Sequence, residues 1–120
     1  MEMSDADQVW NRACASECAG TGPGDRHLWA LLRVHGAVMS GGVGFAADVC
    51  SPEEFARSAD ASRYFGLPHL SRVIARVARS SPEEDEELQA AYDELVPLDQ
   101  VLADAFERRY RAAPLDFAPL

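Results

Sequence analysis

The chain has 120 residues, and its 20 acidic and 11 basic side chains give a formal net charge of −9 at pH 7. This charge argues against direct binding to DNA, RNA or an anionic membrane, because all three are negatively charged themselves. A domain of this length buries roughly two thirds of the surface of its unfolded chain. We therefore expect residues 1–120 to form a single domain whose core needs no disulfide, metal or other cofactor.

The sequence favours a cytoplasmic location. No uninterrupted apolar run approaches the roughly 18 residues of a membrane-spanning helix. The N-terminal segment MEMSDADQVW also lacks the basic and then apolar pattern of a secretory signal. The three cysteines, Cys14, Cys18 and Cys50, are odd in number and fit free thiols better than a disulfide framework. They form no recognisable metal-ligand spacing with the three histidines, so no metal site is expected.

The spacing of apolar residues predicts an all-α fold. Apolar residues recur every three or four positions and almost never alternate, which indicates a compact bundle of about five to six short helices. The first helix should begin near Ser4 or Asp5, and the segment GTGPGD at residues 20–25 should interrupt the chain. We expect Asp25 to cap a second helix that stops at Gly41-Gly42, because glycine adopts a left-handed cap at little cost.

The motif SPEE occurs at residues 51–54 and again at 81–84, and each copy has the features of a helix start. The serine caps the helix, the proline takes the first helical position, and the second glutamate can reach back to the serine backbone. The helix after the first motif should end at Gly66, and the next helix should begin at Pro68.

The last helix is expected to begin at Pro97, since proline is favoured in the first turn. Arg109 falls on the apolar face of this helix, where it can pair with Asp99 or extend its charged end into solvent. The tail over residues 112–120 is apolar and interrupted by prolines. It should lie extended over the domain or over a partner.

The helix expected from Pro82 to Val96 is acidic on one side only. At about 100° per residue, Leu88 and Tyr92 fall on its buried face. The opposite side carries five carboxylates, which are the candidate binding residues: Glu83, Glu86, Glu87, Asp93 and Glu94. Residues 81–107 hold ten acids and no base, whereas residues 67–80 hold three arginines and no acid.

Two explanations of this acidic side remain open. A surface helix needs a polar exterior and glutamate is a good helix former, so the acids can be simply solvated. Most helix surfaces mix both signs, however, and a like-charged pair such as Glu83–Glu87 costs roughly 0.2–0.5 kcal/mol. If the side is functional, it would bind a basic protein surface, speed the encounter and lose affinity as salt rises.

Three segments carry a family resemblance, and they occur in the expected order. They are VMSGGVGFAADV, RYFGLPHLSRVIARV and YDELVPLDQVLADAFERRYRAAPLDF. Over residues 28–117 the chain resembles a bacterial family of acidic helical domains, mostly of unknown function, that includes a DNA-mimic protein; Ser40 stands where this family often has asparagine. The resemblance implies an all-α fold and a homodimer. For the DNA-mimic member it implies an acidic surface that occupies the DNA-binding site of a transcription factor, and it transfers no catalytic residue.

These observations favour a non-enzymatic interaction module that binds a basic protein, with a DNA-mimic regulator as its most specific form. One alternative is an immunity or antitoxin-like protein whose acidic side blocks a basic toxin. Another is an enzyme with a site near Gly41–Phe45, where adjacent glycines let a ligand approach the backbone. The segment GGVG lacks the preceding strand and following lysine of a phosphate-binding loop, so helix termination explains it better.

Overall fold

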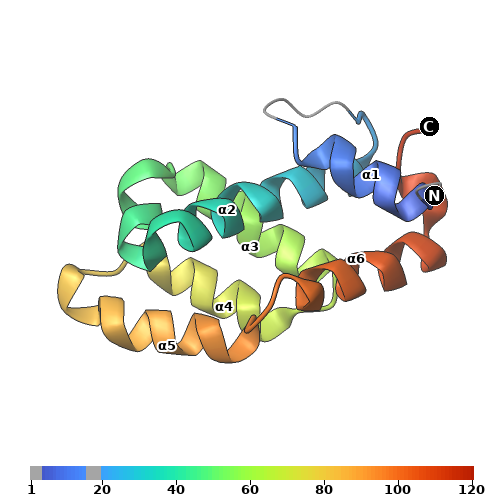
Figure 1. The fold of residues 1–120 in the computed structure, drawn as a ribbon. Coiled ribbons are helices and arrows are strands. Elements are labelled where there is room, and N and C mark those ends of the chain that lie inside the picture. The colour runs from blue at the N-terminus through green and yellow to red at the C-terminus, as the bar shows by residue number, and fades with distance from the viewer. Residues whose placement is uncertain (1–3, 16–19) are drawn as a thin grey trace.

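The computed structural model describes residues 4–15 and 20–120, so Cys18 lies outside the described part of the chain. Within that part the regular structure is entirely helical, and the expected all-α bundle is confirmed (Figure 1). The six α-helices are α1 (Asp5–Ala13), α2 (Pro23–Val49), α3 (Pro52–Tyr64), α4 (Pro68–Val77), α5 (Asp85–Leu95) and α6 (Gln100–Ala112). Two short 3₁₀ helices, η1 (Pro82–Glu84) and η2 (Pro114–Asp116), precede α5 and follow α6.

The first SPEE motif caps its helix as expected. The Ser51 hydroxyl accepts a hydrogen bond from the Glu54 backbone N–H at 3.1 Å, and the Glu54 carboxylate accepts one from the Ser51 N–H at 2.8 Å. This reciprocal pair satisfies two N–H groups that a helix start otherwise leaves without partners. The second motif forms η1 before α5 begins. The last helix starts at Gln100, three residues later than expected.

Helix α2 differs from the prediction at both ends. It begins at Pro23 with Gly22 as its N-cap, and Asp25 occupies the third helical position instead of the cap. The helical geometry is interrupted at Gly42, where φ is 86° and ψ is 178°, but it then resumes through Val49. The glycines therefore break the helix where expected, and the expectation that they end it was wrong.

Side chains of α5 fill the space beside the break in α2. The Val43 N–H donates a hydrogen bond to the Gln89 Oε1 atom at 2.8 Å. A Cβ atom added to Gly44 would lie 2.4 Å from a carboxylate oxygen of Asp85. A side chain at this position would therefore require the Asp85 carboxylate of α5 to move.

The core is centred on α2, which packs against α1, α3, α4 and α5. At the other end of the bundle, Phe106 of α6 lies in an aromatic cluster with Trp10, Phe65, Tyr110 and Phe117, at ring-centroid distances of 5.6–6.3 Å. The tail was expected to lie over the domain or over a partner. It lies over the domain, where Phe117 is buried.

Helix α2 also has the length and hydropathy of a membrane-spanning segment. Its most apolar window of 18 residues has a mean hydropathy of 1.2, although no uninterrupted apolar run of that length occurs in it. In the structure 44% of that window is buried inside the protein. Its position as the central helix accounts for the composition, because such helices are apolar on most of their sides.

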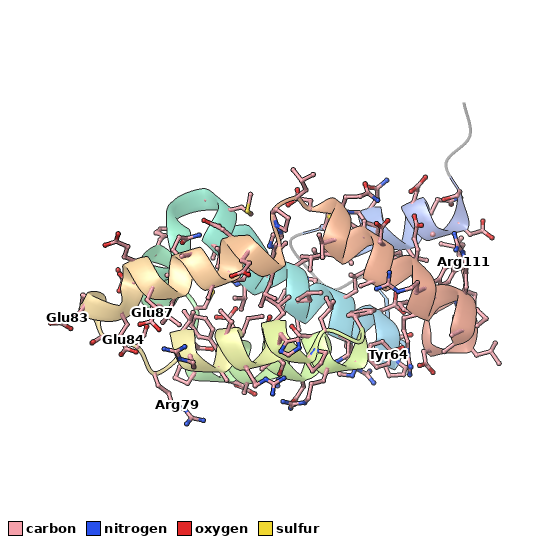
Figure 2. All side chains as sticks on the ribbon, turned by 90° about the horizontal axis from the view of Figure 1, so that it is seen from below. Tyr64, Arg79, Glu83, Glu84, Glu87 and Arg111 are labelled. Carbon is pink, nitrogen blue, oxygen red and sulfur yellow. The ribbon has the colours of Figure 1, made fainter. Side chains whose placement is uncertain are left out.

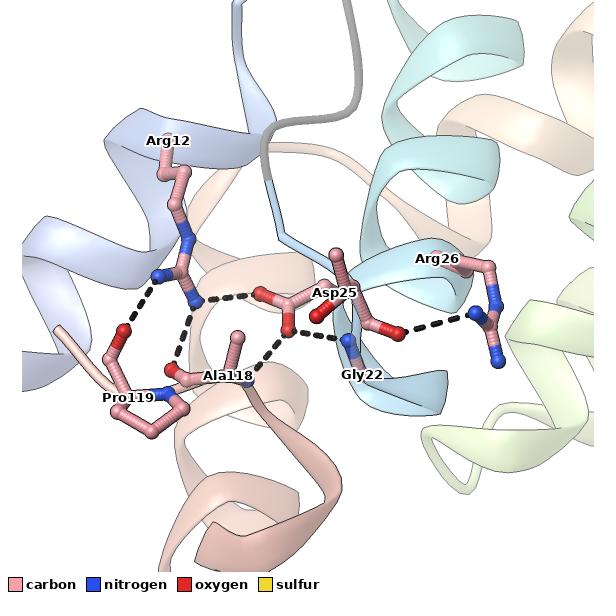
Figure 3. Close-up of polar contacts among 7 residues, drawn as sticks. Arg12, Gly22, Asp25, Arg26, Ala118 and Pro119 are labelled. Atoms are coloured by element: carbon pink, nitrogen blue, oxygen red, sulfur yellow. Dashed lines mark hydrogen bonds and ion pairs between the residues drawn. The ribbon is translucent and has the colours of Figure 1, made fainter.

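A buried carboxylate ties the two ends of the chain together (Figure 3). Asp25 is 2% exposed, and its Oδ1 atom accepts a hydrogen bond from Arg12 of α1 at 2.6 Å. Its Oδ2 atom accepts from the backbone N–H groups of Ala118 at 2.6 Å and Gly22 at 3.2 Å. Arg12 also donates to the carbonyl oxygens of Ala118 and Pro119. One side chain therefore holds α1, the start of α2 and the C-terminal tail.

Candidate functional site

The acidic face is the set of five side chains predicted from the sequence: Glu83, Glu86, Glu87, Asp93 and Glu94. Helix α5 lies at the lower edge of the bundle in Figure 1, where it contacts α4 and α2. Leu88 and Tyr92 are buried against these neighbours, and all five carboxylates are exposed. Glu83 belongs to η1, and the other four belong to α5.

An arginine of α4 reaches one edge of the acidic face. The Arg76 guanidinium lies 3.5 Å from a carboxylate oxygen of Glu87 and 3.8 Å from one of Glu84. Figure 2 shows Glu83, Glu84 and Glu87 gathered where α5 begins. These contacts are long and solvent-exposed, so they weaken the negative potential at this edge without abolishing it.

No cationic side chain in the described part of the chain pairs with the remainder of the acidic face. Within the described residues, the carboxylates of segment 81–107 that pair with a cationic or histidine side chain are Glu84, Glu87, Asp99 and Glu107. Asp93 accepts a hydrogen bond from Gln89 at 2.9 Å, which orients the carboxylate but leaves its charge. A hydrogen bond from Ser81 lowers the pKa of Glu83. The Glu83 carboxylate is therefore ionised at neutral pH.

Beside the acidic face, a buried histidine joins three parts of the fold. His35 of α2 is 6% exposed, its Nδ1 atom lies 2.6 Å from the Tyr92 hydroxyl oxygen, and its Nε2 atom lies 2.7 Å from Asp99. Burial, followed by the negative charges of Asp99 and Asp93, raises the pKa of Tyr92, so the phenol keeps its proton. An imidazole that accepts from Tyr92 at Nδ1 and donates to Asp99 from Nε2 gives both ring nitrogens and the Tyr92 hydroxyl a partner.

This arrangement corrects one expected pairing. Asp99 is the partner of His35, whereas Arg109 lies over the Tyr64 ring at 4.2 Å and 3.7 Å from Asp116. Both ring nitrogens of His35 are occupied, so neither is free to take a proton from a substrate. The histidine therefore acts here as a structural connection between α2, α5 and the start of α6.

Tyr92→Phe should lower the free energy of unfolding by about 1–2 kcal/mol, because it leaves the buried Nδ1 atom of His35 without a donor. Urea denaturation would measure this change. Tyr110→Phe is the matched control, since no hydrogen bond of the Tyr110 hydroxyl occurs in the described residues, and it should change the stability by less than about 0.5 kcal/mol. Equal effects of the two substitutions would contradict a role for the hydroxyl.

The space beside Gly41–Phe45, where the alternative hypothesis places an enzyme site, is filled by side chains of the protein. The approaches to Gly42 and Gly44 are taken by Gln89 and Asp85, and a Cβ atom on Gly41 would meet the side chain of Phe45 at 2.6 Å. In the described part of the chain, no group of three or more His, Cys, Asp or Glu side chains could hold a metal ion. The close backbone approach that glycine permits is used here for packing α5.

Comparisons with known protein families, with curated proteins and with solved structures found no match to this chain. The family resemblance suggested by the sequence therefore stays a prediction. What this protein does must be argued from its own residues, and the acidic face is the feature with the clearest physical consequence.

Proposed function

We propose that this protein is a non-enzymatic interaction module that binds a basic protein surface through the acidic face. The observation that supports the proposal is the row of exposed carboxylates on η1 and α5 that have no cationic partner in the described residues: Glu83, Glu86, Asp93 and Glu94. An isolated helix gains stability from pairs of opposite charge, and these four carboxylates form no such pair in the described residues.

The charges are close enough to act together. Glu86 and Asp93 are seven residues apart, or about 10 Å along a helix, which is close to the Debye length of about 8–10 Å at physiological salt. Their potentials therefore overlap, and a basic surface would be attracted to the whole row. Since each exposed ion pair contributes only about 0–1 kcal/mol, the acidic face would mainly govern encounter rate and partner choice.

A DNA-mimic regulator and an antitoxin-like binder would use the same surface with different partners. Duplex DNA carries one negative charge per roughly 1.7 Å of its axis, and one α5 helix is sparser than that. A mimic of a DNA duplex would therefore need the acidic faces of two copies, or further acids from α6. An inhibitor of a basic toxin needs only a complementary patch, so one copy is sufficient.

Neutralising the acidic face should abolish partner recovery in an affinity purification from the native host. The test variant replaces four carboxylates by isosteric amides: Glu83→Gln, Glu86→Gln, Asp93→Asn and Glu94→Gln. A matched control makes the same number of changes on other helices: Asp5→Asn, Asp48→Asn, Glu53→Gln and Asp60→Asn. Both variants carry a formal net charge of −5, four units above the −9 of the parent chain, so a difference between them is not caused by net charge.

The expected result is recovery of a basic protein, identified by mass spectrometry, with the parent chain and the control but not with the test variant. Bound protein should be released as salt rises from about 0.05 to 0.5 M, because the Debye length falls. Its identity then separates a DNA-binding protein from a toxin. Equal recovery with the two variants, or release that ignores salt, would remove the acidic face from the mechanism.

A further inference from the structure

An open groove of about 880 Å³ runs along the outer side of α2. It is lined by Trp10 of α1 and by residues of α2 on both sides of its break, among them Leu32, Gly36, Phe45 and Val49. A Cβ atom added to Gly36 would meet nothing within 4 Å, so the groove is open at this position. Its surface is mostly apolar and contains both tryptophans of the chain, Trp10 and Trp29.

Exposed apolar side chains gather around the same part of α2. Met39, Phe45 and Val49 are 61%, 43% and 41% exposed, and they are half of the large exposed hydrophobic residues in the described chain. The break at Gly42 permits this arrangement, because it redirects the second part of α2 that carries Phe45 and Val49. Phe45 and Val49 also line the groove, so part of its apolar surface is open to solvent.

One exposed carboxylate, that of Asp99, lines the groove. The Asp99 side chain is 69% exposed, and it follows Asp93 and Glu94 closely along the chain. Arg33 also lines the groove, but Glu54 holds its guanidinium at 2.6 Å and cancels its charge. An occupant of the groove would therefore meet mostly apolar surface and the carboxylate of Asp99.

We infer that the groove receives an amphipathic helix of the basic partner, with the apolar side of that helix packed against Trp10, Trp29 and Phe45. Its basic side chains then face Asp99 and the acidic face. This inference rests on the proposed function. Exposed ion pairs contribute little binding free energy, whereas aromatic and apolar anchors in a desolvated groove contribute most of it in such interfaces. The acidic face attracts the partner, and the groove retains it.

Tryptophan fluorescence gives a direct test, because both tryptophans line the groove. The probes are two synthetic peptides of about 18 residues, or roughly 27 Å as a helix, composed of leucine, alanine and arginine. One peptide places its leucines on a single helical side, and the other has the same composition in an order without an apolar side. The first should shift the emission to shorter wavelength and bind at least about tenfold more tightly than the second.

Gly36→Gln tests the groove without threatening the fold, because glutamine is the better helix former and its side chain has space there. It should weaken binding of the amphipathic peptide about tenfold. Ala56→Gln, at an exposed position of α3, is the matched control and should leave the affinity unchanged.

The outcomes separate this inference from the proposed function. If the two peptides bound equally, and binding were lost only in the variant with a neutralised acidic face, the inference about the groove would be overturned. The proposed function would still stand. Tight binding of the amphipathic peptide that survives neutralisation would support the groove and count against the acidic face. A dimer of the free protein that Gly36→Gln dissociates would show that a second copy fills the groove, which also overturns the inference.

Discussion

Asp25→Ala is expected to lower the free energy of unfolding by about 3 kcal/mol, near the lower end of the range for breaking a buried ion pair. The substitution removes the acceptor for Arg12 and for the backbone N–H groups of Gly22 and Ala118. Arg12 retains some access to water, with 18% of its side chain exposed, so the cost should stay below that of a wholly enclosed pair. Urea denaturation followed by circular dichroism would measure it.

An exposed ion pair supplies the control for Asp25. Asp60 pairs with Arg63 on the surface of α3, and Asp60→Ala should cost less than about 1 kcal/mol. The Asp25→Ala variant should also lose the C-terminal residues to carboxypeptidase faster than the parent chain, since the tail loses its contact through Ala118. Similar stabilities for the two variants would mean that water replaces the buried carboxylate.

Gly42→Ala and Gly36→Ala make the same chemical change in one helix and should shift stability in opposite directions. At Gly42 the backbone has φ of 86° and ψ of 178°, a conformation almost restricted to glycine, and alanine should cost about 2–3 kcal/mol. The new Cβ atom would also press on Gln89 Oε1, at 3.1 Å, which accepts the Val43 N–H. At Gly36 alanine should instead add roughly 0.5–1 kcal/mol, because the position is helical and open.

Thermal and urea unfolding of the two variants would test this opposition. Because both substitutions add one methyl group to α2, a general effect of alanine on the helix cancels in the comparison. If Gly42→Ala were as stable as Gly36→Ala, the break in α2 would not depend on a residue that adopts a positive φ angle. Gly42→Ala should also weaken binding in the groove, since the break positions Phe45 and Val49.

The acidic face and the groove would contribute to partner binding in different ways. Carboxylates in solvent attract over distances near a Debye length but stabilise a bound complex only weakly. Apolar side chains act at contact and stabilise the complex by leaving water. The acidic face and the groove are joined by the connection from α5 to α6 that contains Asp99, so a single basic, amphipathic partner can use both.

The sequence alone determined the helical class, the starts of α1, α3 and α4, and the one-sided acidity of α5. These features are local: a capping serine and its glutamate are three residues apart, and a helix face repeats every three or four positions. The positions of the five candidate carboxylates on the exposed side of the helix followed from the same periodicity. That they bind a partner is a proposal, because solvation alone also produces a polar helix surface.

Only the tertiary structure decided which groups meet. Arg76 reaches Glu87 across the turn between α4 and α5, and His35 meets Tyr92 and Asp99, which lie 57 and 64 residues further along the chain. Local patterns carry no information about such distances. The glycines of α2 show the limit clearly: their flexibility predicted a break, but the helix resumes because α5 supplies Gln89 to the Val43 N–H. Partners brought together by packing are invisible to any rule that reads only neighbouring residues.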